Sequence, residues 1–439
     1  MRKISRRSVL GMTAAVVTGA LSGRPRAALA DPTPPSTEFC WGVGTCGFQS
    51  EGHSPDSHQR RSFLTRSQLA EFPDSVDFYT RYREDIGLAA DLGVGVYRIT
   101  IEWARLQPEP GAWDEDGFAF YDRVLDAMAA QGIRPMLVLD SWVYPVWVGE
   151  RGGWRSPQVV DAWVANARKV VDRYADRDPL WITFITPAGY VKYEVQDGMP
   201  LSDVPAMAAR IVQAHNAIYD HIHRVRPDAR VGMSMNVGIF DVTESVILDQ
   251  VVDRVDYVGL GNYISVSLEN LPDLAEHAVI APHDLSSPLA YWVQPESIFY
   301  ALRYCARRYP GKPLYVVDNG IVSWNGYRED GYDRADHLRD TVYWIQRARS
   351  DGIDVIGYNY WGLTDTFEWG SYDLRYGLYS VEVRTDPTLT RRPTDAVAAY
   401  REITTADGVP HDYLPTRDPA ACSLVDLPSS CGDPVTVPR

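Results

Sequence analysis

Carboxylates, amides and tryptophans recur along this chain just after short apolar segments. Tryptophan faces stack on the apolar C–H side of a pyranose ring, whereas glutamine, asparagine and carboxylate groups form hydrogen bonds with its hydroxyls. One such residue alone is weak evidence, since a tryptophan at the end of a segment is often a core residue. The set as a whole indicates a carbohydrate site, and it consists of Gln49, Arg98, Glu102, Asp140, Ser141, Trp142, Ile185, Thr186, Asn262, Asp318, Asn319, Trp361, Glu368 and Trp369.

The elements that position these residues alternate between predicted strands and amphipathic helices. The strands are expected at 39–45, 94–101, 134–140, 181–185, 230–235, 255–262, 313–317 and 355–361, and the helices at 76–92, 117–131, 157–174, 204–224, 295–308 and 333–350. This order predicts an α/β fold, a single (β/α)8 barrel over 31–404, with a long loop at 264–293 and an irregular tail at 405–439. A doubly wound sheet is the alternative, but no GxGxxG follows the first strand. In such a barrel, chemistry occurs at the carboxyl ends of the strands, where the candidate residues lie.

Composition and the amino terminus limit the partners and the compartment. The 439 residues carry a formal net charge of −15, which disfavours nucleic acid. Residues 1–30 resemble a twin-arginine signal peptide, with Arg6 and Arg7 before an apolar stretch at 11–21 and a small-residue cleavage pattern at 28–30. A membrane anchor would need about 20 consecutive apolar residues. We therefore expect an exported, extracytoplasmic protein with no stable membrane anchor after cleavage.

The cysteines and histidines predict little beyond one disulfide. Cys422 and Cys431 lie in the tail and are expected to pair, although two free thiols are the alternative. Cys40 and Cys46 could pair or be buried, and Cys305 is expected in the core. No histidine arrangement suits a metal, since residues two apart on a helix, such as those at 221 and 223, point to different faces. We expect no metal and no organic cofactor.

A series of ordered motifs is similar to glycoside hydrolase family 1, the β-glucosidase family. The motifs are FCWG at 39–42, GFQSEG at 47–52, YREDI at 82–86, YRITIEWAR at 97–105, NY at 262–263, DTFEW at 365–369 and RP at 392–393. The resemblance extends from residue 39 to about residue 400 and implies a barrel that acts on a carbohydrate or a glycosylated small molecule. It also implies that Gln49, Glu368 and Trp369 bind the distal sugar hydroxyls and that Trp142 and Trp361 form the walls.

The departures from this family fall on the catalytic positions. The fourth strand of the family ends in TFNEP, whose glutamate is the acid/base, but this chain has Ile185 and Thr186 in place of the Asn-Glu pair. The nucleophilic glutamate of the family's TENG corresponds to Asp318, which is one methylene shorter. Ser141 stands in place of a histidine and Ile264 in place of a tyrosine.

These departures predict an altered mechanism. A retaining glycosidase uses two carboxyl groups about 5–5.5 Å apart. Loss of the general acid is expected to lower the reaction rate by a factor of about 10²–10⁴. We expect Arg98 to keep Asp318 ionised and Asp140 or Glu102 to join Asp318 in an altered carboxylate pair. Glu194 is a further acidic residue, interpreted as a solvated carboxylate or an arginine partner.

Three functions are therefore compatible with the sequence. The first is an exported enzyme that acts on a β-glycoside or an activated sugar derivative. The second is a pseudoenzyme that binds carbohydrate without cleaving it. The third is an isomerase or cyclase for a natural product, which an apolar pocket around Ile185, Ile264 and Ile321 would favour.

Overall fold

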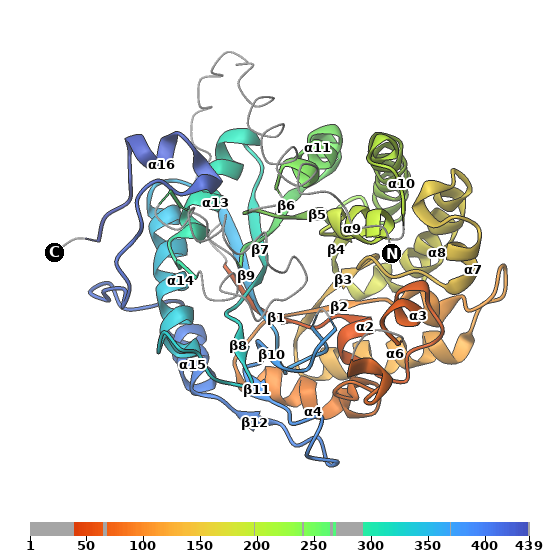
Figure 1. Ribbon diagram of the computed structural model, residues 1–439, viewed down its shortest axis with the longest axis horizontal. Helices are drawn as coiled ribbons and strands as arrows, with labels where there is room; N and C mark the ends of the chain where they lie inside the picture. Colours follow the sequence, from red (N-terminus) through yellow and green to blue (C-terminus); the bar gives the residue numbers. More distant parts are fainter. Residues whose placement is uncertain are drawn as a thin grey trace.

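Eight parallel strands form a closed barrel in the computed structural model, which describes residues 39–64, 68–196, 198–238, 241–263, 267–268, 293–368 and 370–437. The barrel order is β1-β2-β3-β4-β5-β6-β7-β9, and β9 pairs with β1 to close it (Figure 1). The predicted (β/α)8 barrel and all eight predicted strands are confirmed. The strands are β1 (Cys40–Gly44), β2 (Val96–Thr100), β3 (Arg134–Val138), β4 (Leu180–Ile185), β5 (Arg230–Asn236), β6 (Tyr257–Gly261), β7 (Leu314–Asn319) and β9 (Val355–Trp361).

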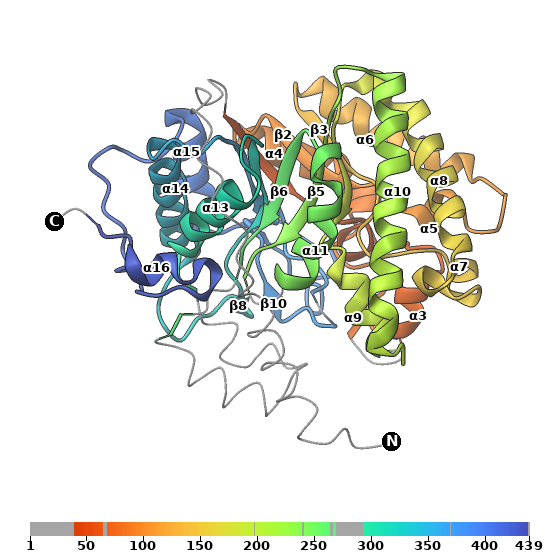
Figure 2. The same cartoon turned by 90° about the horizontal axis from the view of Figure 1, so that it is seen from above.

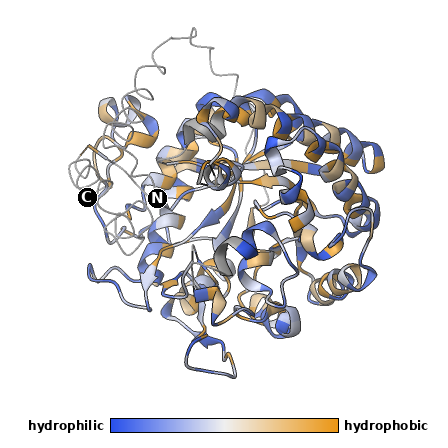
Figure 3. Ribbon diagram, turned by 45° about the vertical axis from the view of Figure 1, so that its right-hand side comes forward, coloured by the Kyte–Doolittle hydropathy of each residue, from blue (hydrophilic) through white to orange (hydrophobic). Residues whose placement is uncertain are grey.

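Helices surround the barrel on the outside (Figures 1 and 2). They form because apolar residues recur every three to four positions, so each helix buries one stripe and exposes the other, as the mixed colouring in Figure 3 shows. Asp114 and Asp333 cap two of them by accepting hydrogen bonds from backbone amides of the first turn. The main helices are α4 (Phe78–Asp91), α6 (Glu115–Ala130), α8 (Gln158–Tyr174), α10 (Val204–Val225), α11 (Asp241–Val251), α13 (Ser297–Arg308), α14 (Arg334–Ser350) and α15 (Asp395–Ala406).

Shorter elements gather at the carboxyl end of the barrel. Figure 2 shows the strands from the side, with α3, α9, β8 and β10 all at one end. These elements were not predicted, since segments of two to nine residues carry too little periodicity. They are α2 (Gly47–Ser50), α3 (His58–Leu64), α5 (Trp103–Leu106), α7 (Val146–Glu150), α9 (Ala188–Gln196), the pair β8 (Ser323–Trp324) and β10 (Leu374–Arg375), and the pair β11 (Tyr379–Ser380) and β12 (Arg392–Pro393).

A buried ion pair joins the two ends of the barrel sequence. Arg391 donates to Asp85 of α4 over 2.8 Å, and both side chains are 1% exposed. A second contact between the two ends is made by Tyr400 of α15, whose hydroxyl donates to the carbonyl oxygen of Gly42 on β1. Such a pair contributes net stability only while both partners are present, because removal of either leaves a buried charge uncompensated.

The chain after α15 packs against α13 and α14. Arg303 of α13 donates to Asp426 over 2.6 Å, and Glu296 accepts from the backbone amide of Ala420. The predicted disulfide between Cys422 and Cys431 is confirmed, and it closes the segment that contains the short helix α16 (Ser429–Gly432). The described residues contain no second disulfide: Cys46 is buried, and Cys305 is buried within α13.

Candidate active site

Arg98 and Asp318 form a buried ion pair at the carboxyl end of the barrel. Arg98 lies on β2 and Asp318 on β7, and the guanidinium contacts the carboxylate over 2.8 and 3.2 Å. Arg98 is 1% exposed and Asp318 is 9% exposed. Burial raises the pKa of Asp318 to about 6, while Arg98 and a hydrogen bond from Tyr263 act in the opposite direction. At this pKa the carboxylate is mostly ionised at neutral pH, and 12% of its side chain remains exposed to solvent.

A second carboxylate, Glu368, is held by three donors in a group that we term the Glu368 cluster. Gln49 donates to one oxygen over 2.9 Å, and Trp361 and Thr366 donate to the other over 2.9 and 2.8 Å. Burial raises the pKa of Glu368 to about 7. The guanidinium of Arg98 lies 4.8 Å from the centre of the Trp361 ring. The Trp361 side chain therefore contacts both Arg98 and Glu368, so the ion pair and the Glu368 cluster belong to one site.

The end of β4 carries no ionisable group. Ile185 is 5% exposed and its amide donates to the carbonyl oxygen of Asp140, whereas Thr186 is half-buried with a backbone φ of 46°. This left-handed conformation turns the chain sharply from β4 toward α9. A hydroxyl at this position can form a hydrogen bond but cannot deliver a proton as an acid near neutral pH.

Asp140 is the centre of a structural hydrogen-bond network at the end of β3. Its carboxylate accepts from the indole of Trp163 over 2.8 Å, from the hydroxyl of Tyr190 over 2.6 and 2.7 Å, and from the amide of Trp142 over 2.8 Å. Burial nevertheless raises the pKa of Asp140 to about 7. Both oxygens are thus already engaged, and the carboxylate fixes the backbone that presents Trp142.

Glu102 is buried beside a second carboxylate, Glu51. Glu51 accepts from Arg105 and from Tyr121, both over 2.9 Å. Burial, and then the charge of Glu51, raise the pKa of Glu102 well above its usual value. Within the described part of the chain, Oε2 of Glu102 has no hydrogen-bond partner. Gly47 makes room for it, because a Cβ at that position would lie 2.7 Å from this oxygen. Burial beside a second carboxylate therefore favours the neutral form of Glu102.

Small polar groups lie between Glu102 and Arg98. The hydroxyls of Thr100 and Ser141 are 2.9 Å apart, and the Thr100 hydroxyl contacts the Cys46 thiol over 3.7 Å. Burial, and then the charge of Glu102, raise the pKa of Cys46 to about 12, so this thiol is not a nucleophile at neutral pH.

The remaining candidates divide between the site and the supporting structure. Asn262 accepts from Ser297 over 2.5 Å and donates to the carbonyl oxygen of Val237, and Asn319 donates to the carbonyl oxygen of Asn262 over 2.6 Å. These bonds fix the ends of β6 and β7 next to Asp318. Trp369 and Ile264 lie outside the described residues, as does most of the predicted 264–293 loop.

Two further candidates, Glu194 and Ile321, have structural roles outside the site. Glu194 is buried and contacts Arg155 over 2.9 Å, so it is an arginine partner and not a solvated carboxylate. Ile321 is fully buried in a separate cluster with Val293 and Tyr332. It therefore packs away from the pocket walls.

Tyrosines that the sequence did not single out line the same site. Tyr263 donates to Asp318, and the Tyr376 ring lies 5.7 Å from the Tyr263 ring. Tyr193 of α9 packs 5.6 Å from the Trp142 ring, and the charge of Glu368 contributes to raising its pKa. The position of Tyr263 directly after Asn262 was a usable signal, whereas nothing local marks Tyr193.

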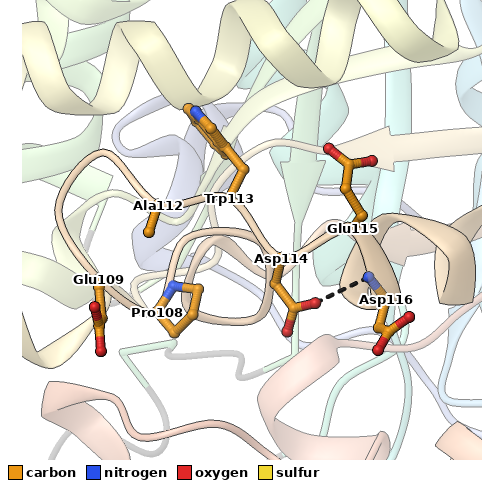
Figure 4. Close-up of a pocket in the computed structure, with 7 residues that line it drawn as sticks. All are labelled: Pro108, Glu109, Ala112, Trp113, Asp114, Glu115 and Asp116. Carbon is orange, nitrogen blue, oxygen red and sulfur yellow. Dashed lines mark hydrogen bonds between the residues drawn. The ribbon is translucent and has the colours of Figure 1, made fainter.

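Other parts of the described chain offer no comparable site. Within the described ranges, no three His, Cys, Asp or Glu side chains lie close enough to hold a metal ion, and no helix is long and apolar enough to span a membrane. A surface hollow between α5 and α6 is lined by the acidic residues Glu109, Asp114, Glu115 and Asp116 with Trp113 (Figure 4). Asp114 is the amino-terminal cap of α6 there, so the hollow reflects local structure.

Comparisons with known proteins agree with this architecture. β-Glucosidase A of Thermotoga maritima is 24% identical over 422 residues, which cover 80% of this chain and 94% of that protein. Phospho-cellobiase of Klebsiella oxytoca is 25% identical and covers 84% of this chain and 97% of its own. The Thermotoga maritima β-glucosidase solved with castanospermine superposes with a TM-score of 0.71 at 23% identity, covering 86% of this chain and all of that one. The sequence profile of glycosyl hydrolase family 1 matches residues 33–245 and 239–409. The chain belongs to glycosyl hydrolase family 1.

Proposed function

We propose that the chain acts on a β-glycoside or an activated sugar derivative, with Asp318 as the group that attacks the anomeric carbon. The observation that carries this proposal is the buried Arg98–Asp318 pair beside the Glu368 cluster. An attacking carboxylate must be ionised, and Arg98 favours that form. Gln49 and Glu368 supply a donor and acceptors for sugar hydroxyls, so the pocket can hold a ring next to Asp318.

The proton donor is the unusual part of this mechanism. Thr186 cannot protonate a leaving oxygen, so substrates whose leaving group departs without a proton react best. Asp140 accepts hydrogen bonds from three donors and serves to position Trp142. Burial and the charge of Glu51 raise the pKa of Glu102, which favours its neutral form, and its Oε2 has no hydrogen-bond partner among the described residues, so we assign the assisting role to this carboxyl.

A carbohydrate-binding pseudoenzyme is the second candidate. It is favoured by the contrast between the complete Glu368 cluster and the end of β4, where Ile185 and Thr186 cannot ionise. The isomerase or cyclase needs an apolar pocket of three isoleucines. Since Ile321 packs elsewhere, no observation supports that alternative.

Hydrolysis of 2,4-dinitrophenyl β-glucoside by residues 31–439 separates the first two candidates, because this leaving group needs no acid. We expect slow turnover that Asp318→Asn abolishes, while Glu102→Gln lowers turnover of alkyl glucosides more than that of the dinitrophenyl substrate. Asp140→Asn serves as a control for packing, checked by the unfolding temperature. If the unsubstituted protein turned over no faster than Asp318→Asn and still bound sugar, the chain would be a carbohydrate-binding pseudoenzyme.

We further propose export through the twin-arginine route. The proposal is supported by the paired arginines at 6 and 7 and by the Cys422–Cys431 disulfide, which suits an oxidising compartment. Fractionation of cells that express the full chain, beside an Arg6→Lys and Arg7→Lys double variant, tests it. Equal amounts of extracytoplasmic protein from both would refute this route.

A further inference from the structure

The last part of the chain, residues 410–433, lies beyond the residues that the family profile matches, which end at 409. We term it the C-terminal segment, and Figures 1 and 2 show its short helix α16 beside α13. Two buried carboxylates fix it to the helices. Asp340 of α14 is fully buried and accepts from the hydroxyl of Tyr413 over 2.6 Å, and Asp426 is 5% exposed and accepts from Arg303 over 2.6 Å. The segment is therefore a firmly packed part of the structure.

Between these two anchors, the C-terminal segment holds the start of α13. The backbone amide of Ala420 donates to Oε1 of Glu296 over 2.9 Å, and both residues are buried. Glu296 directly precedes α13, and its carbonyl oxygen accepts from the amides of Phe299 and Tyr300. Removal of the Glu296 carboxylate would leave the buried Ala420 amide without this acceptor, which is costly. The position of the first turn of α13 is therefore tied to the C-terminal segment.

The first residue of α13, Ser297, connects this helix to the end of β6. Its hydroxyl donates to Oδ1 of Asn262 over 2.5 Å, and Nδ2 of Asn262 donates to the carbonyl oxygen of Val237 over 2.9 Å. Asn262 is 2% exposed, so its amide group is buried and held at both ends. A side chain held in this way has one orientation, and Ser297 therefore helps to determine where the backbone at Asn262 lies.

The backbone of Asn262 is in turn bonded to the strand that carries Asp318. Its amide donates to the carbonyl oxygen of Asp318 over 3.1 Å, and its carbonyl oxygen accepts from Nδ2 of Asn319 over 2.6 Å. The next residue is Tyr263, whose hydroxyl donates to the carboxylate of Asp318. The contacts that hold Asn262 therefore also place the Tyr263 hydroxyl relative to this carboxylate.

A second contact holds the chain beyond Tyr263. Ser267 forms an antiparallel β-bridge with Ser423 of the C-terminal segment, and the amide of Leu268 donates to the carbonyl oxygen of Cys422 over 3.2 Å. Ser267 is fully buried and Ser423 is 3% exposed. The C-terminal segment therefore holds the chain on both sides of Tyr263, through α13 on one side and directly on the other.

We propose that the C-terminal segment positions the Tyr263 hydroxyl on Asp318, with Glu296 and Ser297 as the positioning residues that link the segment to the site. The inference rests on the proposed function, in which Asp318 attacks the anomeric carbon. Hydrogen bonds weaken steeply when their distance or angle departs from the optimum. Small shifts at Asn262 therefore change how well the ionised carboxylate is stabilised, although the segment itself does not touch it.

The test compares the acid limb of kcat/KM for 2,4-dinitrophenyl β-glucoside among variants along this series of contacts. Ser297→Ala and Glu296→Ala should each lower kcat/KM at pH 5 about 2- to 5-fold and leave it unchanged at pH 8, because a weaker bond to ionised Asp318 moves the limb up by about half a pH unit. Glu296→Gln keeps an oxygen that can accept from Ala420, and it should restore the wild-type limb. In a Tyr263→Phe background, Ser297→Ala should have no further effect, since the hydroxyl that it positions is gone.

Tyr413→Phe is the matched control within the C-terminal segment. It removes one donor to Asp340, which keeps others, and leaves the bond between Ala420 and Glu296 in place. It should lower the unfolding temperature without moving the acid limb. Hydrogen exchange measured by mass spectrometry is a readout that needs no turnover, and the peptide that contains Asn262 should exchange faster in the two alanine variants than in Tyr413→Phe.

Two results would overturn the inference. One is that the acid limb stays with that of the wild type in every alanine variant that folds. The other is that Tyr413→Phe moves the limb as much as the alanine variants do, because the cause would then be a general loosening of the segment. If the wild type shows no turnover, the proposed function fails and the exchange data decide. Faster exchange at Asn262 in the alanine variants alone would then support the inference, and equal exchange in all three variants would overturn it.

Discussion

The ionisation of Asp318 should control the acid limb of the pH–rate profile. Burial raises its pKa to about 6, and only the ionised carboxylate can attack carbon. At that pKa the ionised fraction is about one-tenth at pH 5 and about nine-tenths at pH 7, so kcat/KM should rise about tenfold over this interval. An aspartate with an ordinary pKa would be almost fully ionised at both values and would give a flat profile.

Tyr263→Phe perturbs this carboxylate directly. It removes a hydrogen bond to the ionised form of Asp318, and such bonds contribute about 1.5–3 kcal/mol. Because one pKa unit corresponds to about 1.4 kcal/mol, the pKa should rise by about one to two units. The acid limb should therefore move to higher pH, and the loss of activity on acidification should begin earlier.

The assay is kcat/KM for 2,4-dinitrophenyl β-glucoside across the acid range, since this substrate makes the rate independent of a proton donor. Tyr376→Phe is the matched control, because it removes a hydroxyl from the ring that packs against Tyr263 and keeps the ring itself. Its limb should stay with that of the wild type. A limb well below pH 5 in the wild type, or a limb that Tyr263→Phe leaves in place, would refute the assignment of Asp318.

Three further changes have directional outcomes. Thr186→Glu should raise kcat/KM for an alkyl β-glucoside by about 10²–10⁴-fold and that for the dinitrophenyl substrate far less, and an equal rise for both would contradict an acid role at the end of β4. Arg391→Met should lower the free energy of unfolding in urea by about 3–5 kcal/mol, because Asp85 stays buried without its partner; Asp85→Leu added to it should recover much of the loss. The double variant Cys422→Ser and Cys431→Ser should lower the free energy of unfolding by about 2–3 kcal/mol at most, which thermal unfolding would measure. It should leave kcat in the dinitrophenyl assay unchanged.

The barrel could be predicted from the sequence because its strands are buried on both sides. The run at 355–361 is buried throughout and, apart from Asn359, consists of apolar, aromatic and glycine residues, and the helices between such runs carry regular apolar stripes. The short elements that shape the site were not predicted, because they carry too little sequence pattern. Segments such as α2 and β8 contain only two to four residues, and tertiary contacts hold them in place.

The kinds of residue at the candidate site could be predicted from the sequence, but the partners of each carboxylate could not. Asp140 and Glu102 both follow a strand, and nothing in the neighbouring residues distinguishes them. The difference arises from partners far away in the sequence: Trp163 and Tyr190 occupy Asp140, whereas Glu51 approaches Glu102. Likewise, the hydroxyl of Tyr263 reaches Asp318 only because β6 and β7 are neighbours in the closed barrel.

Closure of the barrel also constrains how the chain can be made. Cys40 of β1 aligns with Gly357 of β9, so the last seam joins segments more than 300 residues apart. A ribosome that adds about 5–20 residues per second needs roughly 15–60 s to travel between them. During that interval the emerging β1 has one edge without its strand partner, and unpaired edges favour association with other chains. Nascent chains halted before residue 355 should therefore be bound by chaperones or aggregate, and folding should complete only after β9 leaves the ribosome.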